Sequence, residues 1–455
     1  MIRALSDLVA GLDGLPAPVW RGEIRSAAGM TLEVDGLQRL LAVGDKCWAE
    51  TVQGERILCE TIGFRHGRSL LMAFDALDGV AEGCHAVVEG ERSAVRPGPG
   101  WLGRIVDALG RPVDGRGPLA DAGEARALRA APPAAVSRRR VGARLETGVR
   151  AVDCFVPICR GQRMGIFAGS GVGKSTLLSM LARHADADAV VLGLIGERGR
   201  EVQEFLQEDL GEAGLARSVV VVATSDEPPL MRRQAAWLTL AAAEALRDQG
   251  LHVLCMMDSL TRFATAQREI GLAAGEPPTT KGYPPTVFAE LPRLLERAGP
   301  GTGTQGDITG IFTVLVDGDD HDEPVADAVR SILDGHLVLD RRIAEQGRYP
   351  AVSVLRSVSR TLPGCHSDEE YRLLTRARAL SAVHDDMHEL VRIGAYRRGA
   401  DPEVDAAVDF HPRLEAFLRQ TRDDRTPARD AFADLAARLA ATGRHDTAPP
   451  PGDGE

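Results

Sequence analysis

The sequence has no hydrophobic run long enough to span a membrane or to act as a signal peptide, and acidic residues interrupt the apolar stretch at its start. It has no CxxC pair, and its seven cysteines are scattered and odd in number. That pattern suggests neither a disulfide framework nor a zinc module. Both absences predict a soluble protein of the reducing cytoplasm, in solution or peripheral to a membrane.

Positive charge is also scarce. The formal net charge is −11, and lysine occurs only at Lys46, Lys174 and Lys281. An extended nucleic-acid-binding surface needs clustered lysine and arginine to displace counterions, so this composition disfavours one. Only a local basic pore remains compatible with the charge.

The composition is that of a folded protein. Hydrophobic residues make up 44% of the 455 residues and charged residues 26%, which is typical of soluble globular chains. A chain of this length predicts about two to four domains.

Apolar spacing and turn residues divide the chain into segments. Helical spacing predicts a short amphipathic helix over Ile2–Leu12, which either packs on its own domain or binds a partner. Short apolar runs between turn residues predict a small antiparallel β-barrel, and helical spacing returns beyond Arg360. The predicted segments are 1–19 for the amphipathic helix, 20–92 for the barrel, 93–360 for an α/β domain, 361–445 for a helical domain and 446–455 for a disordered tail.

The α/β segment contains apolar strands separated by helical stretches. The strands read RMGIFA, AVVLGLI, SVVVVAT, HVLCMM and GIFTVLV. Continuous runs of valine, isoleucine and leucine are typical of a parallel sheet buried on both faces.

The strand RMGIFA leads into AGSGVGKST, at Ala168–Thr176, and then into a helical stretch, which is the context of a phosphate-binding P-loop. Its glycines allow the backbone N–H groups to face an anion, Lys174 supplies a charge for the β and γ phosphates, and Ser175 a Mg²⁺ ligand. Ala168 departs from the usual first glycine and is tolerable if it keeps ordinary φ. The predicted nucleotide-binding residues here are Gly169, Ser170, Gly171, Val172, Gly173, Lys174, Ser175 and Thr176.

Two further carboxylates are candidates for the same site. Asp258 ends the apolar strand HVLCMM and is predicted to hold Mg²⁺ through water; Asp317 is the rival, in a loop that resembles a solvated turn. Glu197, beside Arg198, is a candidate to orient or deprotonate the attacking water. On pattern alone, a Glu in such a strand-to-helix loop is more often a helix cap or a surface charge than a base.

Four longer blocks resemble a known family. GERGREVQEF, DSLTRFATAQREIG, EPPTTKGYPPTVFAELPRLLERAG and RYPAVSVLRSVSR are similar to the export ATPases of the bacterial flagellum, relatives of the catalytic subunits of rotary ATP synthases, and the likeness runs from about Gly22 to Leu418. The resemblance implies a small N-terminal β-barrel, a RecA-like P-loop ATPase core and a C-terminal helical domain. It also implies a homohexamer with ATP at the subunit interfaces.

The resemblance also implies roles for single residues. Glu197 would be the catalytic carboxylate, with Arg198 and Arg262 near the γ-phosphate. Tyr349 would stack on the adenine, and Arg360 would be an arginine finger that enters the neighbouring subunit's site. Taken alone, Tyr349 reads as a core aromatic and Arg360 as a surface charge. Ser353 stands where the family usually has Asp or Asn, which leaves any role of that side chain in doubt.

The implied partners follow from the same family. They are a dimeric regulator bound by the N-terminal helix and a coiled-coil stalk protein, for which the segment from Arg392 to Val404 is a candidate contact. Export chaperones, export substrates and a membrane export gate complete the set, which places the protein in the cytoplasm, peripheral to the inner membrane.

Three alternatives remain at this stage: a virulence-type (injectisome) secretion ATPase, a rotary ATP synthase catalytic subunit, and a ring translocase for RNA. Glu197 argues against a noncatalytic synthase subunit. The RNA hypothesis needs clustered aromatics on the barrel, whereas Trp20, Trp48, Phe64 and Phe74 are scattered.

Overall fold

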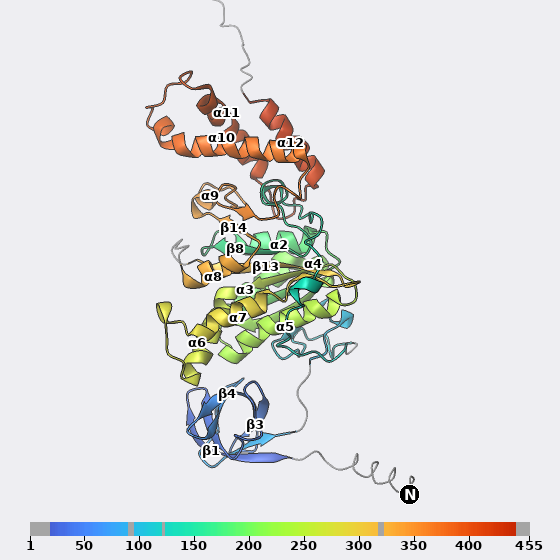
Figure 1. Ribbon diagram of the computed structural model, residues 1–455, viewed down its shortest axis with the longest axis vertical. Coiled ribbons are helices and arrows are strands. Elements are labelled where there is room, and N and C mark those ends of the chain that lie inside the picture. The colour runs from blue at the N-terminus through green and yellow to red at the C-terminus, as the bar shows by residue number, and fades with distance from the viewer. Residues whose placement is uncertain (1–18, 90–94, 121–122, 317–322, 443–455) are drawn as a thin grey trace, which may run out of the picture.

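The computed structural model describes residues 19–89, 95–120, 123–316 and 323–442. These form three units stacked along one axis: a barrel, an α/β layer and a group of helices (Figure 1). The fold class expected from the sequence is confirmed. The predicted helix over Ile2–Leu12, the rival aspartate Asp317 and the tail 446–455 lie outside the described residues.

The first unit is a closed antiparallel barrel with the strand order β1-β2-β5-β4-β3-β6. In β2 and β3 every second residue is buried, as expected for strands with one face towards an apolar interior. Ile24, Leu32, Val34 and Leu71 fill that interior and are fully buried. The strands are β1 (Trp20–Ala28), β2 (Thr31–Asp35), β3 (Lys46–Glu50), β4 (Arg56–Arg65), β5 (Arg68–Ala73) and β6 (His85–Val88).

The second unit is built on a sheet with the order β15-β14-β8-β13-β11-β9-β10-β7, in which β12 also pairs with β13. From β14 to β7 the paired strands are parallel, whereas β15 and β12 are antiparallel to their neighbours. The strands are β7 (Arg104–Asp107), β8 (Arg163–Ala168), β9 (Ala189–Glu197), β10 (Ser218–Thr224), β11 (Val253–Asp258), β12 (Gly299–Pro300), β13 (Asp307–Leu315), β14 (Gly335–Leu339) and β15 (Val358–Ser359).

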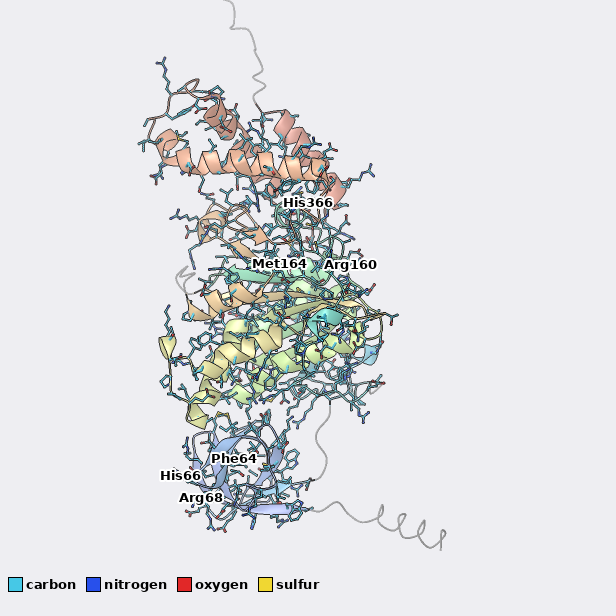
Figure 2. The ribbon with its side chains drawn as sticks, viewed as in Figure 1. Phe64, His66, Arg68, Arg160, Met164 and His366 are labelled. Carbon is cyan, nitrogen blue, oxygen red and sulfur yellow. The ribbon has the colours of Figure 1, made fainter. Side chains whose placement is uncertain are left out.

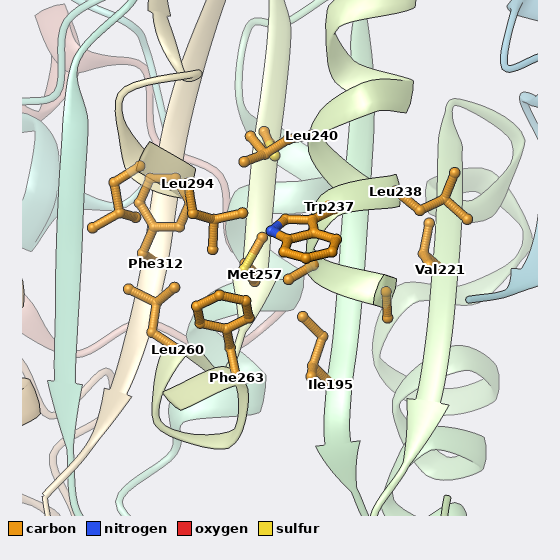
Figure 3. Packing of buried hydrophobic residues seen from close by; sticks show 14 of the residues in the cluster. Ile195, Val221, Trp237, Leu238, Leu240, Met257, Leu260, Phe263, Leu294 and Phe312 are labelled. Carbon is orange, nitrogen blue, oxygen red and sulfur yellow. The ribbon is translucent and has the colours of Figure 1, made fainter. Parts of the chain in front are cut away.

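Both faces of this sheet are buried, which explains the continuous apolar strands in the sequence. Val191 and Val221 point into one hydrophobic cluster, and their neighbours Val190 and Val220 point into the other. On the first face Trp237 packs over the strands that carry Ile195 and Met257 (Figure 3). The helices of this unit are α2 (Lys174–His184), α3 (Gly199–Glu204), α4 (Gly211–Ala216), α5 (Pro229–Arg247), α6 (Leu260–Ala274), α7 (Pro285–Leu295), α8 (Pro324–Ile332) and α9 (Arg341–Glu345).

Short irregular helical turns connect several of these elements. The 3-10 turns are η1 (Pro99–Trp101), η2 (Ala135–Ser137) and η5 (Thr280–Gly282), and the π-helical turns are η3 (Ala151–Phe155) and η4 (Phe205–Leu210).

The third unit consists of α10 (Asp368–Arg392), α11 (Pro402–Leu418) and α12 (Ala428–Ala440). Helix α10 begins with a capping box, because the Ser367 side chain accepts from the Glu370 backbone and the Glu370 side chain accepts from the Ser367 backbone. The apolar side chains of these helices join the cluster on the second face of the sheet. None of the helices in the described part of the chain combines the length and apolarity that crossing a bilayer requires.

A buried ion pair connects the barrel to the sheet layer. The Arg233 guanidinium of α5 donates to Glu60 of β4 at 2.7 Å, and the two side chains are 3% and 4% exposed. Arg129 donates to the same carboxylate at 3.3 Å and stacks on the Trp237 ring at 3.9 Å. Glu60 therefore neutralises two cations at the junction.

Glu60→Gln should destabilise the protein by roughly 3–5 kcal/mol, because it leaves a buried guanidinium without its counter-charge. Urea unfolding followed by tryptophan fluorescence measures the loss. The matched control is Glu403→Gln, which removes an exposed pair with Arg376 (52% and 56% exposed). The control should change stability by less than about 1 kcal/mol. Equal effects of the two variants would contradict the account.

Candidate active site

The candidate site lies at the carboxyl ends of four neighbouring strands. In the sheet order β8-β13-β11-β9, the P-loop follows β8, Thr313 lies in β13, Asp258 ends β11 and Glu197 ends β9. Parallel strands deliver their carboxyl ends to one edge of a sheet, where open α/β folds bind ligands. Residues far apart in sequence therefore meet there.

The P-loop has the geometry of an anion site. Gly171 (φ 76°) and Gly173 (φ 85°) have left-handed backbone conformations that favour glycine, and α2 begins directly afterwards at Lys174. The loop therefore directs a helix N-terminus at its centre. Ala168 is paired in the sheet with Leu315 and Leu339, so its departure from glycine requires no unusual backbone.

The Lys174 ammonium lies between two carboxylates. Its Nζ donates to Asp258 Oδ1 at 2.5 Å and to Glu197 Oε1 at 3.3 Å, and the three side chains are 12%, 8% and 15% exposed. Burial acts to lower the pKa of Lys174, but the charges of Asp258 and Glu197 outweigh it and raise that pKa. The structure thus brings together three residues that the sequence analysis assigned to one site.

Thr313 is a member of this cluster that the sequence analysis missed. Its hydroxyl donates to Asp258 Oδ1 at 2.6 Å, the same oxygen that accepts from Lys174. A threonine inside the apolar run GIFTVLV was the available signal, because a fully buried hydroxyl needs a partner.

Glu197 has a proton affinity suited to neutral pH. Burial is the main cause that raises the pKa of its carboxyl to about 7, the nearby Asp258 carboxylate adds to the shift, and Lys174 opposes it. A carboxyl that titrates near neutrality can hold or release a proton at the working pH, as a general base must.

The two candidate arginines lie differently. Arg262 is in the first turn of α6, whose N-cap Ser259 follows Asp258. Its side chain packs against Gly196, the neighbour of Glu197 in sequence. A Cβ placed on Gly196 would lie 2.8 Å from the Arg262 side chain. Arg198 is 81% exposed and pairs with Glu201 at 3.4 Å. The structure therefore brings Arg262 to the site and leaves Arg198 directed to its own helix.

Tyr349 lies against the P-loop and is not a core aromatic. It is 40% exposed, and its ring atoms would lie 3.1 and 3.2 Å from a Cβ placed on Gly173. Ser353, in contrast, is 8% exposed and caps a local turn, where its hydroxyl accepts from the Arg356 backbone at 3.4 Å.

Arg360 lies at the opposite end of the sheet from the P-loop of its own chain. It follows β15, and its backbone N–H donates to Asp334 O at 3.0 Å, just before β14 begins. The P-loop is level with the other end of β14, where Leu339 pairs with Ala168. At about 3.3 Å per residue, the strand from Asp334 to Leu339 separates the two by roughly 16 Å. The exposed side chain of Arg360 is therefore available to a neighbour and remote from its own site.

The donors at this edge suit Mg²⁺. Ser175 is exposed in the first turn of α2, and the Asp258 carboxylate already holds one cation, the Lys174 ammonium. Oxygen ligands from one or two side chains, completed by water and substrate phosphates, are what Mg²⁺ prefers. Among the described residues there is no group of three or more His, Cys, Asp or Glu side chains that could hold a metal ion.

Comparison with known proteins identifies the family. A family model described as "ATP synthase alpha/beta family, nucleotide-binding domain" matches residues 148–359, and one described as "T3SS EscN ATPase C-terminal domain" matches residues 366–437. The "Flagellum-specific ATP synthase" of Caulobacter vibrioides is 55% identical over 436 residues, which cover 95% of this chain and 98% of that protein. The chain belongs to the flagellar and type III secretion ATPases of the ATP synthase alpha/beta family.

Other members of this ATPase family are similar over nearly the whole chain. A "Type 3 secretion system ATPase" of Xanthomonas euvesicatoria is 46% identical over 403 residues, which cover 88% of this chain and 90% of that one. The assembled ATPase EscN of the enteropathogenic E. coli type III secretion system is 40% identical, with a TM-score of 0.86 and coverage of 92% and 100%. EscN in complex with its central stalk EscO is 39% identical, with a TM-score of 0.83, and the match covers 92% of this chain and 100% of that one.

The raised pKa of Glu197 predicts a pH-dependent cost to stability. Because its folded-state pKa of about 7 lies above the ordinary 4.5, the stability due to proton uptake is full below about pH 4.5 and is lost as the pH rises through 7. Glu197→Gln lacks this titration. As the pH rises over that range, the free energy of unfolding of Glu197→Gln should increase relative to that of the wild type by on the order of 3 kcal/mol. Urea unfolding without nucleotide measures the difference, and a pH-independent difference would contradict the assignment.

Proposed function

We propose that this ATPase hydrolyses MgATP in a homohexameric ring and thereby energises or prepares the export of flagellar proteins through a type III secretion apparatus. The observation that carries the proposal is the buried Lys174 held by Asp258 and Glu197 at the P-loop, with Arg360 at the far end of the same sheet. Each chain then supplies most of its own nucleotide site and contributes Arg360 to the site of the adjacent subunit.

Nucleotide binding would rearrange the charges at the P-loop. The backbone of Gly169–Thr176 and the Lys174 ammonium bind the β and γ phosphates, so Lys174 exchanges its carboxylate partners for phosphate oxygens. That exchange frees Glu197, which orients the attacking water and accepts its proton at a carboxylate oxygen. Arg262 is placed beside Glu197 to contact the γ-phosphate, and Arg198 reaches it only if its exposed side chain turns inward.

Ser175 directly, and Asp258 through water, would hold Mg²⁺, which when bound neutralises charge on the phosphate oxygens. Thr313 keeps the Asp258 carboxylate oriented for that role. Tyr349, against Gly173 and partly exposed, offers a flat surface on which the adenine stacks.

Arg360 would complete the site of the adjacent subunit as an arginine finger. A finger of this kind contributes about 10³–10⁵ in rate, so isolated chains should hydrolyse slowly. Head-to-tail contacts, in which one surface meets a different surface of the next copy, generate a closed ring when the rotation between copies closes. The assembled state of the similar EscN supports a ring here.

The proposed partners surround such a ring. A coiled-coil stalk protein would contact the mostly exposed segment from Arg392 to Val404 between α10 and α11; the similar EscN is known in complex with its central stalk EscO. A dimeric regulator would bind the N-terminal segment, and chaperones, substrates and the export gate would meet the ring in the cytoplasm, at the inner membrane. Nucleic acid has no part in this proposal.

The flagellar assignment rests on sequence likeness. Identity is 55% to the Caulobacter flagellar protein and 46% and 40% to the two secretion ATPases. The match of residues 366–437 to a type III secretion C-terminal domain favours export over ATP synthesis and over RNA translocation.

Replacing Lys174 tests both the chemistry and the branch. Lys174→Ala should abolish ATP hydrolysis by the purified chain because it removes the phosphate-binding charge. Cells that carry only this variant should assemble few or no flagellar filaments. Lys174→Arg should fail as well, since a planar guanidinium does not replace a point charge inside the loop.

Circular dichroism should show that both variants are folded, which separates loss of chemistry from loss of fold. Near-normal turnover by Lys174→Ala would refute the ATPase site. If turnover is lost but cells still assemble normal filaments, the flagellar role is refuted and the assignment of the ATPase site stands.

Mixing inactive chains tests whether the site is shared. Glu197→Gln and Arg360→Ala subunits should regain activity together, because about a quarter of the interfaces in randomly mixed rings pair an intact Glu197 with an intact Arg360. Glu197→Gln mixed with Lys174→Ala is the matched control. Both defects then lie in the same half of the site, so no interface is restored. Equal activity of the two mixtures, in rings verified to be mixed, would contradict a finger acting between subunits.

A further inference from the structure

A second reactive cluster lies at the junction of the sheet layer and the C-terminal helices. Cys159 is on the loop that enters β8, and Cys365 is on the turn between Arg360 and α10. His366, the next residue, is at this junction between the two units (Figure 2). Neither cysteine belongs to the nucleotide site, and neither is part of a disulfide.

Cys159 and Cys365 belong to one hydrogen-bonded network, because Gln162 Oε1 accepts from the Cys159 N–H and, at 3.4 Å, from the Thr361 hydroxyl beside Cys365. The Thr361 hydroxyl lies 3.5 Å from Cys365 Sγ, and His366 Nδ1 lies 3.9 Å from it. Both sides of the pair are anchored: the Cys159 N–H donates to Gln162 Oε1 at 2.8 Å, and His366 Nε2 lies 3.1 Å from Cys154 O. The fold therefore holds the two cysteines in one network.

The two sulfurs differ in their environment. A hydrogen bond from the Cys159 thiol lowers the pKa of Cys365, and the adjacent His366 lowers it further. The same hydrogen bond and burial raise the pKa of Cys159. The Arg144 guanidinium lies 3.4 Å from His366 Nδ1, and its charge acts on Cys159, whose pKa it lowers against the two larger causes. Cys159 is 1% exposed, whereas Cys365 is only partly buried.

This asymmetry is what a peroxide-reactive pair requires. A reactive cysteine is a partly exposed thiolate in an electropositive environment, and a second thiol in contact resolves its oxidised form. We propose that Cys159 and Cys365 form a redox site, in which a peroxide oxidises Cys365 and Cys159 closes a reversible disulfide.

The chemistry balances with a peroxide as the oxidant. The Cys365 thiolate attacks one oxygen of hydrogen peroxide, an S–O bond forms, the O–O bond breaks, and the departing hydroxide takes a proton to become water. Cys159 then loses its proton and attacks the Cys365 sulfur. An S–S bond forms, the S–O bond breaks, and a second water leaves. Two thiols are oxidised by two electrons, and one peroxide is reduced to two waters.

The bond would join the turn that follows Arg360 to the loop that precedes the P-loop strand. That region is already closely connected, because Ser359 Oγ donates to Pro157 O at 2.7 Å and the Gln162 side chain donates to Ser359 Oγ at 3.1 Å. A covalent link here fixes the Arg360 turn to β8. Oxidation thus acts on the segment that carries the proposed finger.

The chain contains its own control in a second cysteine pair. Cys47 and Cys59 are directly opposite each other on the antiparallel strands β3 and β4. Both are buried, and burial raises the pKa of both thiols. These two cysteines are close together, but they are protonated at neutral pH and shielded from peroxide, so they should stay reduced under the same treatment.

The test is to treat the reduced full-length protein with hydrogen peroxide, block free thiols, digest it and analyse the peptides by mass spectrometry. A peptide that joins Cys159 to Cys365 should appear, disappear on treatment with dithiothreitol and be absent from Cys365→Ser. No peptide should join Cys47 to Cys59. His366→Asn should slow formation of the link at least several-fold while leaving ATP hydrolysis intact, which separates a positioning role from a structural one.

Two results would overturn the proposal. One is oxidation of Cys365 to sulfinic acid while Cys159 stays free. The other is a Cys47–Cys59 link that forms as fast as the Cys159–Cys365 link. A Cys159→Ala chain extends the test, because Cys365 should then accumulate as the sulfenic acid, trapped by dimedone, and no trapped adduct would likewise overturn it.

Discussion

The Lys174 ammonium, held between the carboxylates of Asp258 and Glu197, is the interaction on which the site depends. Without that cation, two largely buried carboxylates would face each other at a cost of several kcal/mol per ion. The same arrangement makes the site responsive, since phosphate oxygens compete with the carboxylates for Lys174. In the proposed mechanism, nucleotide binding and the release of Glu197 are parts of one exchange of partners.

The topology of the sheet supports the proposal that a single chain holds an incomplete site. Four adjacent strands deliver the P-loop, Thr313, Asp258 and Glu197 to one edge, while the antiparallel strand β15 places Arg360 at the other. At roughly 16 Å of strand from the P-loop of its own chain, Arg360 fits the proposed role only in the site of another subunit. The proposed ring is therefore a consequence of strand direction as well as of family likeness.

Much of this was predictable from sequence where the signal is local. The strand, loop and helix around Lys174 are contiguous, and Asp258 and Glu197 each end an apolar strand, so parallel strands had to bring them together. Thr313 was missed because a threonine inside a buried strand gives no periodic signal. Tyr349 and Arg360 depended on the family, since neither partial exposure beside Gly173 nor an edge-strand position is visible in the chain. The proximity of Cys159 to Cys365 arises only from tertiary packing of segments distant in sequence.

The most direct measurement is a structure, by electron cryomicroscopy, of the Glu197→Gln chain assembled with ATP and Mg²⁺. The account predicts a closed ring in which Arg360 of one subunit contacts the phosphates held by the P-loop of the next, and Lys174 has moved from Asp258 to those phosphates. A ring in which Arg360 lies far from every nucleotide, or in which Lys174 still bridges the carboxylates beneath a bound ATP, would contradict it.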